Sequence, residues 1–152
     1  MDTSDAAVVR RVLNGDVEAY SILVERYFDH YVRFAIHLVG NREDAEEVVQ
    51  DTFLRAYRAL GRYEERERFG AWLLRILVNR ARTVSAMGRR REKMFPEQLA
   101  DTLPEAAEAH PAERAALREE MARALGQLGA EQREAFLLHY VEGLSYEEMS
   151  AV

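Results

Sequence analysis

The segment DAEEVVQDTFLRAY, Asp44–Tyr57, decides the fold, because its side chains separate into two faces at helical spacing. In a soluble protein such helices bury their apolar faces against one another. The polar face then either meets only water or binds a partner, and the residues downstream distinguish these two cases. The apolar face comprises Ala45, Val48, Val49, Phe53, Ala56 and Tyr57, and the polar face comprises Asp44, Glu47, Gln50, Asp51 and Arg55.

The residues before this segment predict two more helices. Ser4 is placed to cap a short first helix, and Asp16 to cap a second helix that runs to about Val39. The second helix has a wide apolar face with a period of about 3.6 residues. Gly40 predicts its end, and Asn41 predicts a fresh N-terminal cap for the segment quoted above.

The residues after the segment predict a loop and then a helix. The loop, GRYEERER over residues 61–68, is short and densely charged. The helix, FGAWLLRILVNRARTVSAM over residues 69–87, carries Arg75, Asn79 and Arg82 along one polar face. Its buried side is expected to consist of Phe69, Trp72, Leu73, Ile76, Leu77 and Val84.

The last third of the chain predicts a linker and a smaller helical unit. All three prolines lie between residues 92 and 112, among alanine and acidic residues. Two apolar stripes follow, over Leu117–Leu128 and Phe136–Val141, and they are expected to pack against each other. Ser145 and Glu148 form a capping box that begins one more helix. The predicted fold is therefore all-α, with a helical domain at 1–91, a linker at 92–112 and a partial helical domain at 113–152.

Composition excludes several functional classes. The absence of cysteine excludes disulfides and thiolate chemistry. No run of about 18 apolar residues and no signal peptide is recognisable, so we expect a cytoplasmic location. Without a glycine-rich phosphate loop, a GxSxG sequence or an HExxH sequence, we predict no enzyme activity, catalytic residue, cofactor or metal site. His30 and His37 are expected to be partly exposed helix residues.

Charge is distributed unevenly along the chain. The net charge is −6, which argues weakly against nucleic-acid binding. However, residues 73–93 carry seven basic side chains and one acidic side chain, whereas both flanks are acidic. This basic island could face phosphate, or it could be the solvated end of a helix.

The residue types in the island favour single-stranded DNA over a purely solvated face. Arginines can meet phosphate or guanine, and Asn79 can pair with a base edge. Aromatic side chains lie just before the island, and exposed bases stack on such rings. Phe69 and Trp72 are expected to belong to the core, whereas Tyr63 lies in the polar loop and is expected to be exposed.

These segments resemble a known family. DAEEVVQDTFLRAYRAL followed by FGAWLLRILVNRARTVSAMGRRR is similar to the bacterial RNA polymerase sigma factors of the extracytoplasmic-function (ECF) group. The later LGQLGAEQREAFLLHYVEGLSYEEMSAV looks like the start of their second domain, so the resemblance covers nearly the whole chain. It implies that residues 1–91 form the sigma region 2 domain and that residues 113–152 belong to the region 4 domain.

The resemblance gives the polar face of Asp44–Tyr57 a partner. In this family the matching helix docks on the clamp coiled coil of the polymerase β′ subunit. Leu54 is apolar but lies off the buried stripe among acidic residues, which agrees with such an interface. By position, the implied polymerase contacts are Asp44, Glu47, Gln50, Asp51, Leu54 and Arg55.

The resemblance also gives the basic island a role in transcription initiation. The family's loop and following helix recognise and melt the promoter minus-10 element and capture a flipped base of the non-template strand. Arg89–Arg91 would hold the phosphate backbone. The implied DNA-binding residues are Tyr63, Asn79, Arg80, Arg82, Thr83, Arg89, Arg90 and Arg91.

One departure from the family pattern lies near Val152. GLSYEEMSAV supplies only the first helix of the helix-turn-helix that reads the minus-35 element, so truncation within the region 4 domain is expected. An anti-sigma factor is a further implied partner. Two alternatives stay open: a stand-alone helical DNA-binding regulator, and a helical protein-interaction module without DNA binding.

Overall fold

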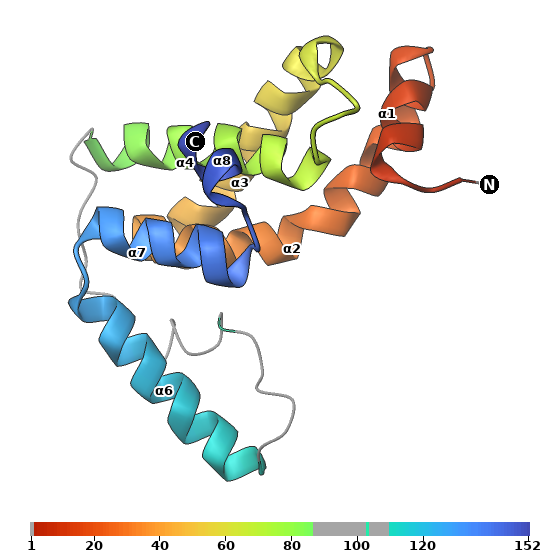
Figure 1. Cartoon of the computed structure of the whole chain (residues 1–152). Coiled ribbons are helices and arrows are strands. Elements are labelled where there is room, and N and C mark those ends of the chain that lie inside the picture. Colours follow the sequence, from red (N-terminus) through yellow and green to blue (C-terminus); the bar gives the residue numbers. More distant parts are fainter. Residues whose placement is uncertain (1, 87–102, 104–109) are drawn as a thin grey trace.

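A computed structural model describes residues 2–86, 103 and 110–152, and every regular element in these residues is helical (Figure 1). The prediction of an all-α fold is therefore confirmed. Most of the predicted linker lies outside the described residues, and α6 begins at Pro111, inside the last two residues of that range. The elements are α1 (Asp5–Leu13), η1 (Val17–Ala19), α2 (Tyr20–Val39), α3 (Arg42–Ala59), η2 (Leu60–Arg62), α4 (Phe69–Ala86), α6 (Pro111–Gln127), α7 (Ala130–Phe136), η3 (Leu137–Val141) and α8 (Tyr146–Ser150).

Local side-chain chemistry sets most of the helix ends as predicted. The Ser4 Oγ accepts a hydrogen bond from the Ala7 amide, and the Asn41 Oδ1 accepts one from the Asp44 amide at 2.8 Å. Gly40 ends α2 with a φ of 94°, a left-handed conformation that glycine adopts without a steric penalty. Ser145 forms the predicted capping box at the start of α8.

The predicted cap at Asp16 is wrong. Its carboxylate accepts hydrogen bonds from the Arg11 guanidinium, at 2.8 and 3.0 Å, instead of from the amides of the following helix. Residues 17–19 form a separate 3₁₀ turn, and α2 starts only at Tyr20. The strong charge-assisted pair with Arg11 explains why this aspartate is not available as a cap.

Helices α2, α3 and α4 pack around the main core. They contribute fully buried side chains such as Leu23, Val49, Leu73 and Leu77. The Tyr31 hydroxyl, which is also inside, donates to the Gly70 carbonyl at 2.8 Å and so joins α2 to the start of α4. This bond satisfies a buried polar group, and it fixes where α4 begins relative to α2.

The C-terminal helices lie against this domain instead of forming a separate body. Helix α7 packs on α2, and α8 lies in front of α4 (Figure 1). Helix α7 runs directly into η3, a π-helical turn that is closed by a bond from the Glu142 amide to the Leu137 carbonyl at 3.0 Å. Leu137, Leu138 and Leu144 are buried in the shared core, so residues 137–144 anchor the C-terminal segment.

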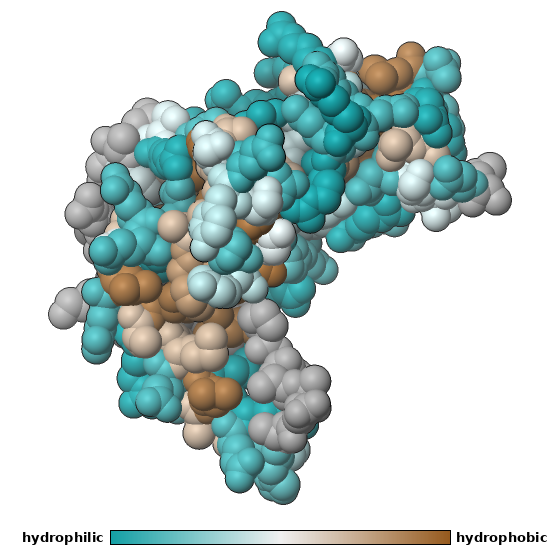
Figure 2. Space-filling view, in the orientation of Figure 1, coloured by the Kyte–Doolittle hydropathy of each residue, from teal (hydrophilic) through white to brown (hydrophobic). Residues whose placement is uncertain are grey.

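Helix α6 extends away from the rest of the molecule. Of its predicted stripe, Leu125 is buried, but Leu117, Met121 and Leu128 are 45, 37 and 36% exposed. Apolar surface gathers in Figure 2 in the lower part of the molecule, over α6 and α7. The expectation that the two C-terminal stripes pack mainly against each other is therefore wrong, because three of the four residues of the first stripe, and Tyr140 of the second, are exposed.

The two histidines of α2 differ from each other. His30 is exposed and lies 2.8 Å from the Glu142 carboxylate. His37 is only 3% exposed, so the expectation of partial exposure is wrong for it. Its burial, together with the nearby Arg133 cation, lowers its pKa to about 4.

Candidate functional site

The polar face of α4 carries three of the predicted DNA-binding residues. Asn79 and Arg82 are exposed, and Thr83 is exposed but donates its hydroxyl to the Asn79 carbonyl at 3.0 Å. Half-buried Arg75 lies on the same face and pairs with Glu67 at 3.5 Å. The structure therefore places an amide and two guanidinium groups along one face of a rigid helix.

Tyr63 is less exposed than predicted. Its ring meets Phe69 and Trp72 at centroid distances of 5.4 Å each, and its hydroxyl donates to the Glu67 carbonyl at 2.7 Å. Burial raises the pKa of the hydroxyl. The expected core positions of Phe69 and Trp72 are confirmed, with 2 and 7% exposure. Tyr63 is thus the outermost ring of an aromatic cluster that sets the conformation of the loop before α4.

Arg80 points toward α3 and not along the outer face of α4. Its guanidinium pairs with the Asp51 carboxylate at 2.5 Å, and Asp51 also pairs with Arg55 at 2.8 Å. Arg80 was predicted to bind DNA and Asp51 to bind polymerase, and the structure brings these two residues into contact. Their ion pair connects the two candidate surfaces, and a second role for Arg80 toward DNA would require that pair to rearrange.

The outer face of α3 places four predicted polymerase contacts on one surface. Leu54 is 57% exposed, and Glu47 and Gln50 are exposed one to two turns earlier. Arg55 is exposed beside them. Asp44 is half-buried, because its carboxylate accepts a hydrogen bond from the Asn41 amide nitrogen at 2.9 Å. The face is therefore an apolar side chain surrounded by acids and an amide.

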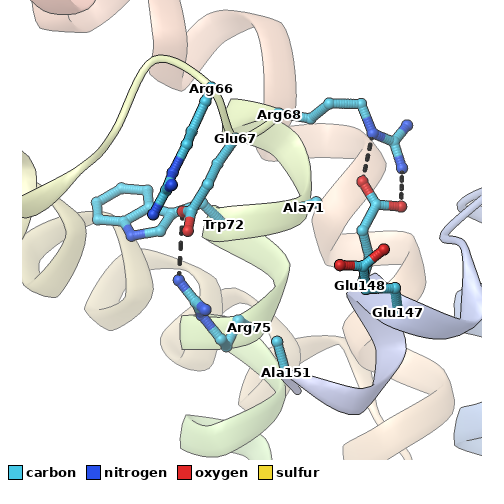
Figure 3. Close-up of a pocket in the computed structure, with 9 residues that line it drawn as sticks. All are labelled: Arg66, Glu67, Arg68, Ala71, Trp72, Arg75, Glu147, Glu148 and Ala151. Atoms are coloured by element: carbon cyan, nitrogen blue, oxygen red, sulfur yellow. Dashed lines mark hydrogen bonds and ion pairs between the residues drawn. The ribbon is translucent and has the colours of Figure 1, made fainter.

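A pocket of about 530 Å³ lies between the loop before α4, the start of α4, and α8 (Figure 3). Arg68 spans its rim and forms two bonds to the Glu148 carboxylate, at 2.5 and 2.7 Å. The hydrogen bonds from Arg68 lower the pKa of Glu148 to about 2. The pocket is lined by Arg66, Glu67, Arg68, Ala71, Trp72, Arg75, Glu147, Glu148 and Ala151.

Sequence reasoning missed two cations of this pocket, Arg66 and Arg68. Both lie in a loop where basic and acidic residues are mixed, so residue type does not distinguish these two arginines from the other charged residues of the loop. Only the fold shows that these two arginines face the same space as Arg75. The predicted phosphate contacts Arg89, Arg90 and Arg91 lie outside the described residues.

The described residues also show neither a membrane-spanning helix nor a metal-binding cluster. None of the described helices is both long and apolar enough to cross a membrane. Within residues 2–86, 103 and 110–152, histidine, aspartate and glutamate do not gather in threes in a way that could hold a metal ion.

Comparison with known proteins matches both halves of the chain to sigma factor families. Residues 23–91 match the Sigma-70 region 2 family, and residues 118–152 match the Sigma-70 region 4 family. The solved structure of CnrH in complex with the cytosolic domain of CnrY is similar, with a TM-score of 0.66 and 27% identity over 97% of this chain and 80% of that one.

Curated relatives extend this match along almost the whole chain. The RNA polymerase sigma-H factor of Pseudomonas aeruginosa is 34% identical over 97% of this chain and 81% of its own length. CarQ of Myxococcus xanthus is 35% identical over 95% of this chain and 82% of its own length. The ECF sigma-E factor of Escherichia coli K12 is 34% identical over 98% of this chain and 82% of its own length. The chain belongs to the ECF group of bacterial RNA polymerase sigma factors.

Proposed function

We propose that this sigma factor binds core RNA polymerase through the outer face of α3 and recognises and melts the minus-10 element with α4 and the loop before it. As a member of its family the chain acts in transcription initiation and belongs to a class of non-enzymatic factors. The observation that carries the proposal is that one helical core presents two surfaces of different character. One is acidic around an exposed leucine, and the other is basic around an exposed asparagine.

The surface of α3 suits the clamp coiled coil of the β′ subunit. An exposed leucine at the centre of a polar rim is typical of an interface anchor, because its burial removes apolar area from water while the rim sets orientation. Glu47 and Gln50 lie within two turns of Leu54 on the same face of α3. These contacts would operate in the bacterial cytoplasm, where polymerase and DNA are found.

Replacing Leu54 with alanine is expected to weaken binding to core polymerase by roughly tenfold or more, because an interface anchor loses most of its buried area. Helicity and unfolding should not change, since the side chain is 57% exposed. A titration of labelled chain with core polymerase measures the effect. Leu13→Ala is the matched control, because Leu13 is 53% exposed on α1.

Equal affinities for the parent and the Leu54→Ala variant would remove α3 from the polymerase interface and favour a stand-alone DNA-binding regulator. Asp51→Arg is not a suitable second variant. It would place a cation between Arg55 and Arg80, and it would disturb the contact between α3 and α4 as well as the surface.

The DNA-binding part of the proposal rests on the outer face of α4. Asn79 is exposed, and its carboxamide can pair with the edge of an unpaired base. Arg82 lies about one turn further on, and Arg75 about one turn before, so phosphates on either side of that base can be met by cations. Beyond the described residues, Arg89–Arg91 would extend the phosphate contact.

Asn79→Ala is expected to weaken binding of an A/T-rich DNA single strand by roughly tenfold, because hydrogen bonds to a base edge are lost. Fluorescence anisotropy with a labelled strand of about 12 nucleotides gives the affinity. Ser85→Ala, an exposed change on the same helix, should bind like the parent. If Asn79→Ala also binds like the parent, base capture does not occur at this position.

A protein inhibitor of the anti-sigma class is the third partner that we propose. CnrH, whose structure is similar, was solved in complex with the cytosolic domain of CnrY. The exposed apolar residues of α6 offer a surface on which such a partner could bury side chains.

A further inference from the structure

We propose that residues 130–152 act as an intramolecular cover of the DNA-binding face, in which glutamates of the C-terminal segment occupy the arginines that DNA phosphates would otherwise meet. This inference rests on the proposed DNA-binding role of α4. It adds a competition within the chain between the C-terminal segment and DNA. The chain would then exist in closed and open arrangements, and the structure is the closed one.

Between described residues, three contacts of a basic with an acidic side chain join the two parts of the chain, and all three have the same polarity. Arg68 pairs with Glu148 at 2.5 Å, His30 lies 2.8 Å from Glu142, and Arg82 pairs with Glu134. In each pair the base belongs to the N-terminal domain and the acid to the C-terminal segment. Residues 130–152 carry five carboxylates and a single arginine, so the segment as a whole is complementary to a basic surface.

The fold holds the three glutamates in position for these contacts. The side chains of Glu142 and Glu134 are 6 and 15% exposed. Glu148 is fixed at the start of α8, where its carboxylate also accepts the Ser145 amide at 2.8 Å. Leu137, Leu138 and Leu144 anchor the same segment in the core.

In the closed arrangement, glutamates bind the guanidinium groups that would otherwise bind DNA phosphate. Arg82 lies on the outer face of α4, and its guanidinium forms an ion pair with the Glu134 carboxylate. Arg68 lies at the rim of the pocket of Figure 3, and its Nε and Nη2 groups donate to the Glu148 carboxylate. Helix α8 itself forms one wall of that pocket, through Glu147, Glu148 and Ala151. A DNA strand on this face would therefore have to compete with Glu134 and Glu148 for the two arginines.

Closure leaves the proposed polymerase surface free. Leu54 is 57% exposed in the closed arrangement, and Gln50 is also exposed. The Arg68 and Arg82 side chains stay 57 and 51% exposed in their pairs, so solvent weakens these pairs and phosphate can compete for the two arginines. The cover would lower DNA affinity in the free chain without blocking its docking on polymerase.

The test is the affinity of the 152-residue chain for the labelled A/T-rich single strand. Glu134→Gln combined with Glu148→Gln is expected to raise this affinity about fivefold, because both cations become available. The matched control is Glu113→Gln with Glu120→Gln, which removes two charges from exposed positions of α6, outside the cover. The affinity of the control variant for the strand should differ from that of the parent by less than twofold.

A distance measurement makes the test independent of DNA. Because the chain has no cysteine, spin labels can be placed at Ser85→Cys on α4 and Ser150→Cys on α8, both exposed positions. The parent should give one short distance, and the double glutamine variant should add a longer component. DNA should add the same component to the parent.

Equal affinities and unchanged distances in parent and variant would overturn the cover. An equal gain in the control would overturn it too, since the effect would then come from net charge. If the distance lengthens but no variant binds DNA, the masking is overturned together with the DNA-binding function. Loss of polymerase binding by Leu54→Ala is a separate readout that does not depend on closure.

Discussion

Replacing Phe69 with alanine is expected to lower the free energy of unfolding by about 3–5 kcal/mol. The ring is 2% exposed at the first residue of α4, and it lies 5.4–5.8 Å from the rings of Tyr27, Tyr63 and Trp72. Alanine would leave a cavity at the centre of this aromatic cluster. The surrounding helices cannot collapse into it fully, because the Tyr31 hydroxyl bond to Gly70 holds α2 against the same turn.

Urea unfolding followed by circular dichroism at 222 nm measures this loss. Phe69→Leu serves as the conservative control and should cost less, since most of the buried volume remains. Leu54→Ala should fall within about 0.5 kcal/mol of the parent, because its side chain is on the surface. A loss below about 1 kcal/mol for Phe69→Ala would contradict the described position of this ring in the core.

Acidification from pH 7 to pH 5 is expected to lower the free energy of unfolding by about 2 kcal/mol through His37 alone. Burial, with the Arg133 cation, lowers the pKa of His37 from 6.5 to about 4 in the folded chain. Below about pH 6.5 the His37 ring is protonated in the unfolded chain but stays neutral in the folded chain. This part of the stability is therefore complete above about pH 6.5 and is lost as the pH falls toward 4.

The measurement is a series of urea unfolding curves between pH 7 and pH 5, for the parent and for His37→Gln. The variant has no titrating ring at this position, so its stability should depend much less on pH. Glu148 does not complicate this range, because its pKa of about 2 and its ordinary value of 4.5 both lie below pH 5. Equal slopes for the two proteins would show that His37 is accessible to protons in the folded chain.

The predictable part of the fold is the part that local chemistry determines. Asn41 and Ser145 cap helices because a short polar side chain reaches the amides of the next turn, wherever the helix later packs. Gly40 ends α2 for an equally local reason. Asp16 was predicted wrongly, since an arginine five residues earlier competes for its carboxylate.

The candidate site is predictable only where one helix face carries it. Asn79 and Arg82 share a face because of helical spacing, and Leu54 follows from the family resemblance, with which its place off the buried stripe agrees. Glu134 and Glu148 could not be found in this way, because they meet their arginines across 52 and 80 residues of sequence. Tyr63 shows the same limit: its loop is polar in sequence, but two later aromatic residues fold against its ring.

The measurement that tests the account most directly is competition for core RNA polymerase. Labelled ECF sigma-E factor of E. coli, a relative that is 34% identical, is bound to core enzyme and titrated with this chain. The account predicts that the parent and Leu13→Ala displace the labelled factor, whereas Leu54→Ala needs roughly tenfold more protein. Failure of the folded, helical parent to displace it at any excess would contradict the claim that α3 is a polymerase-docking surface.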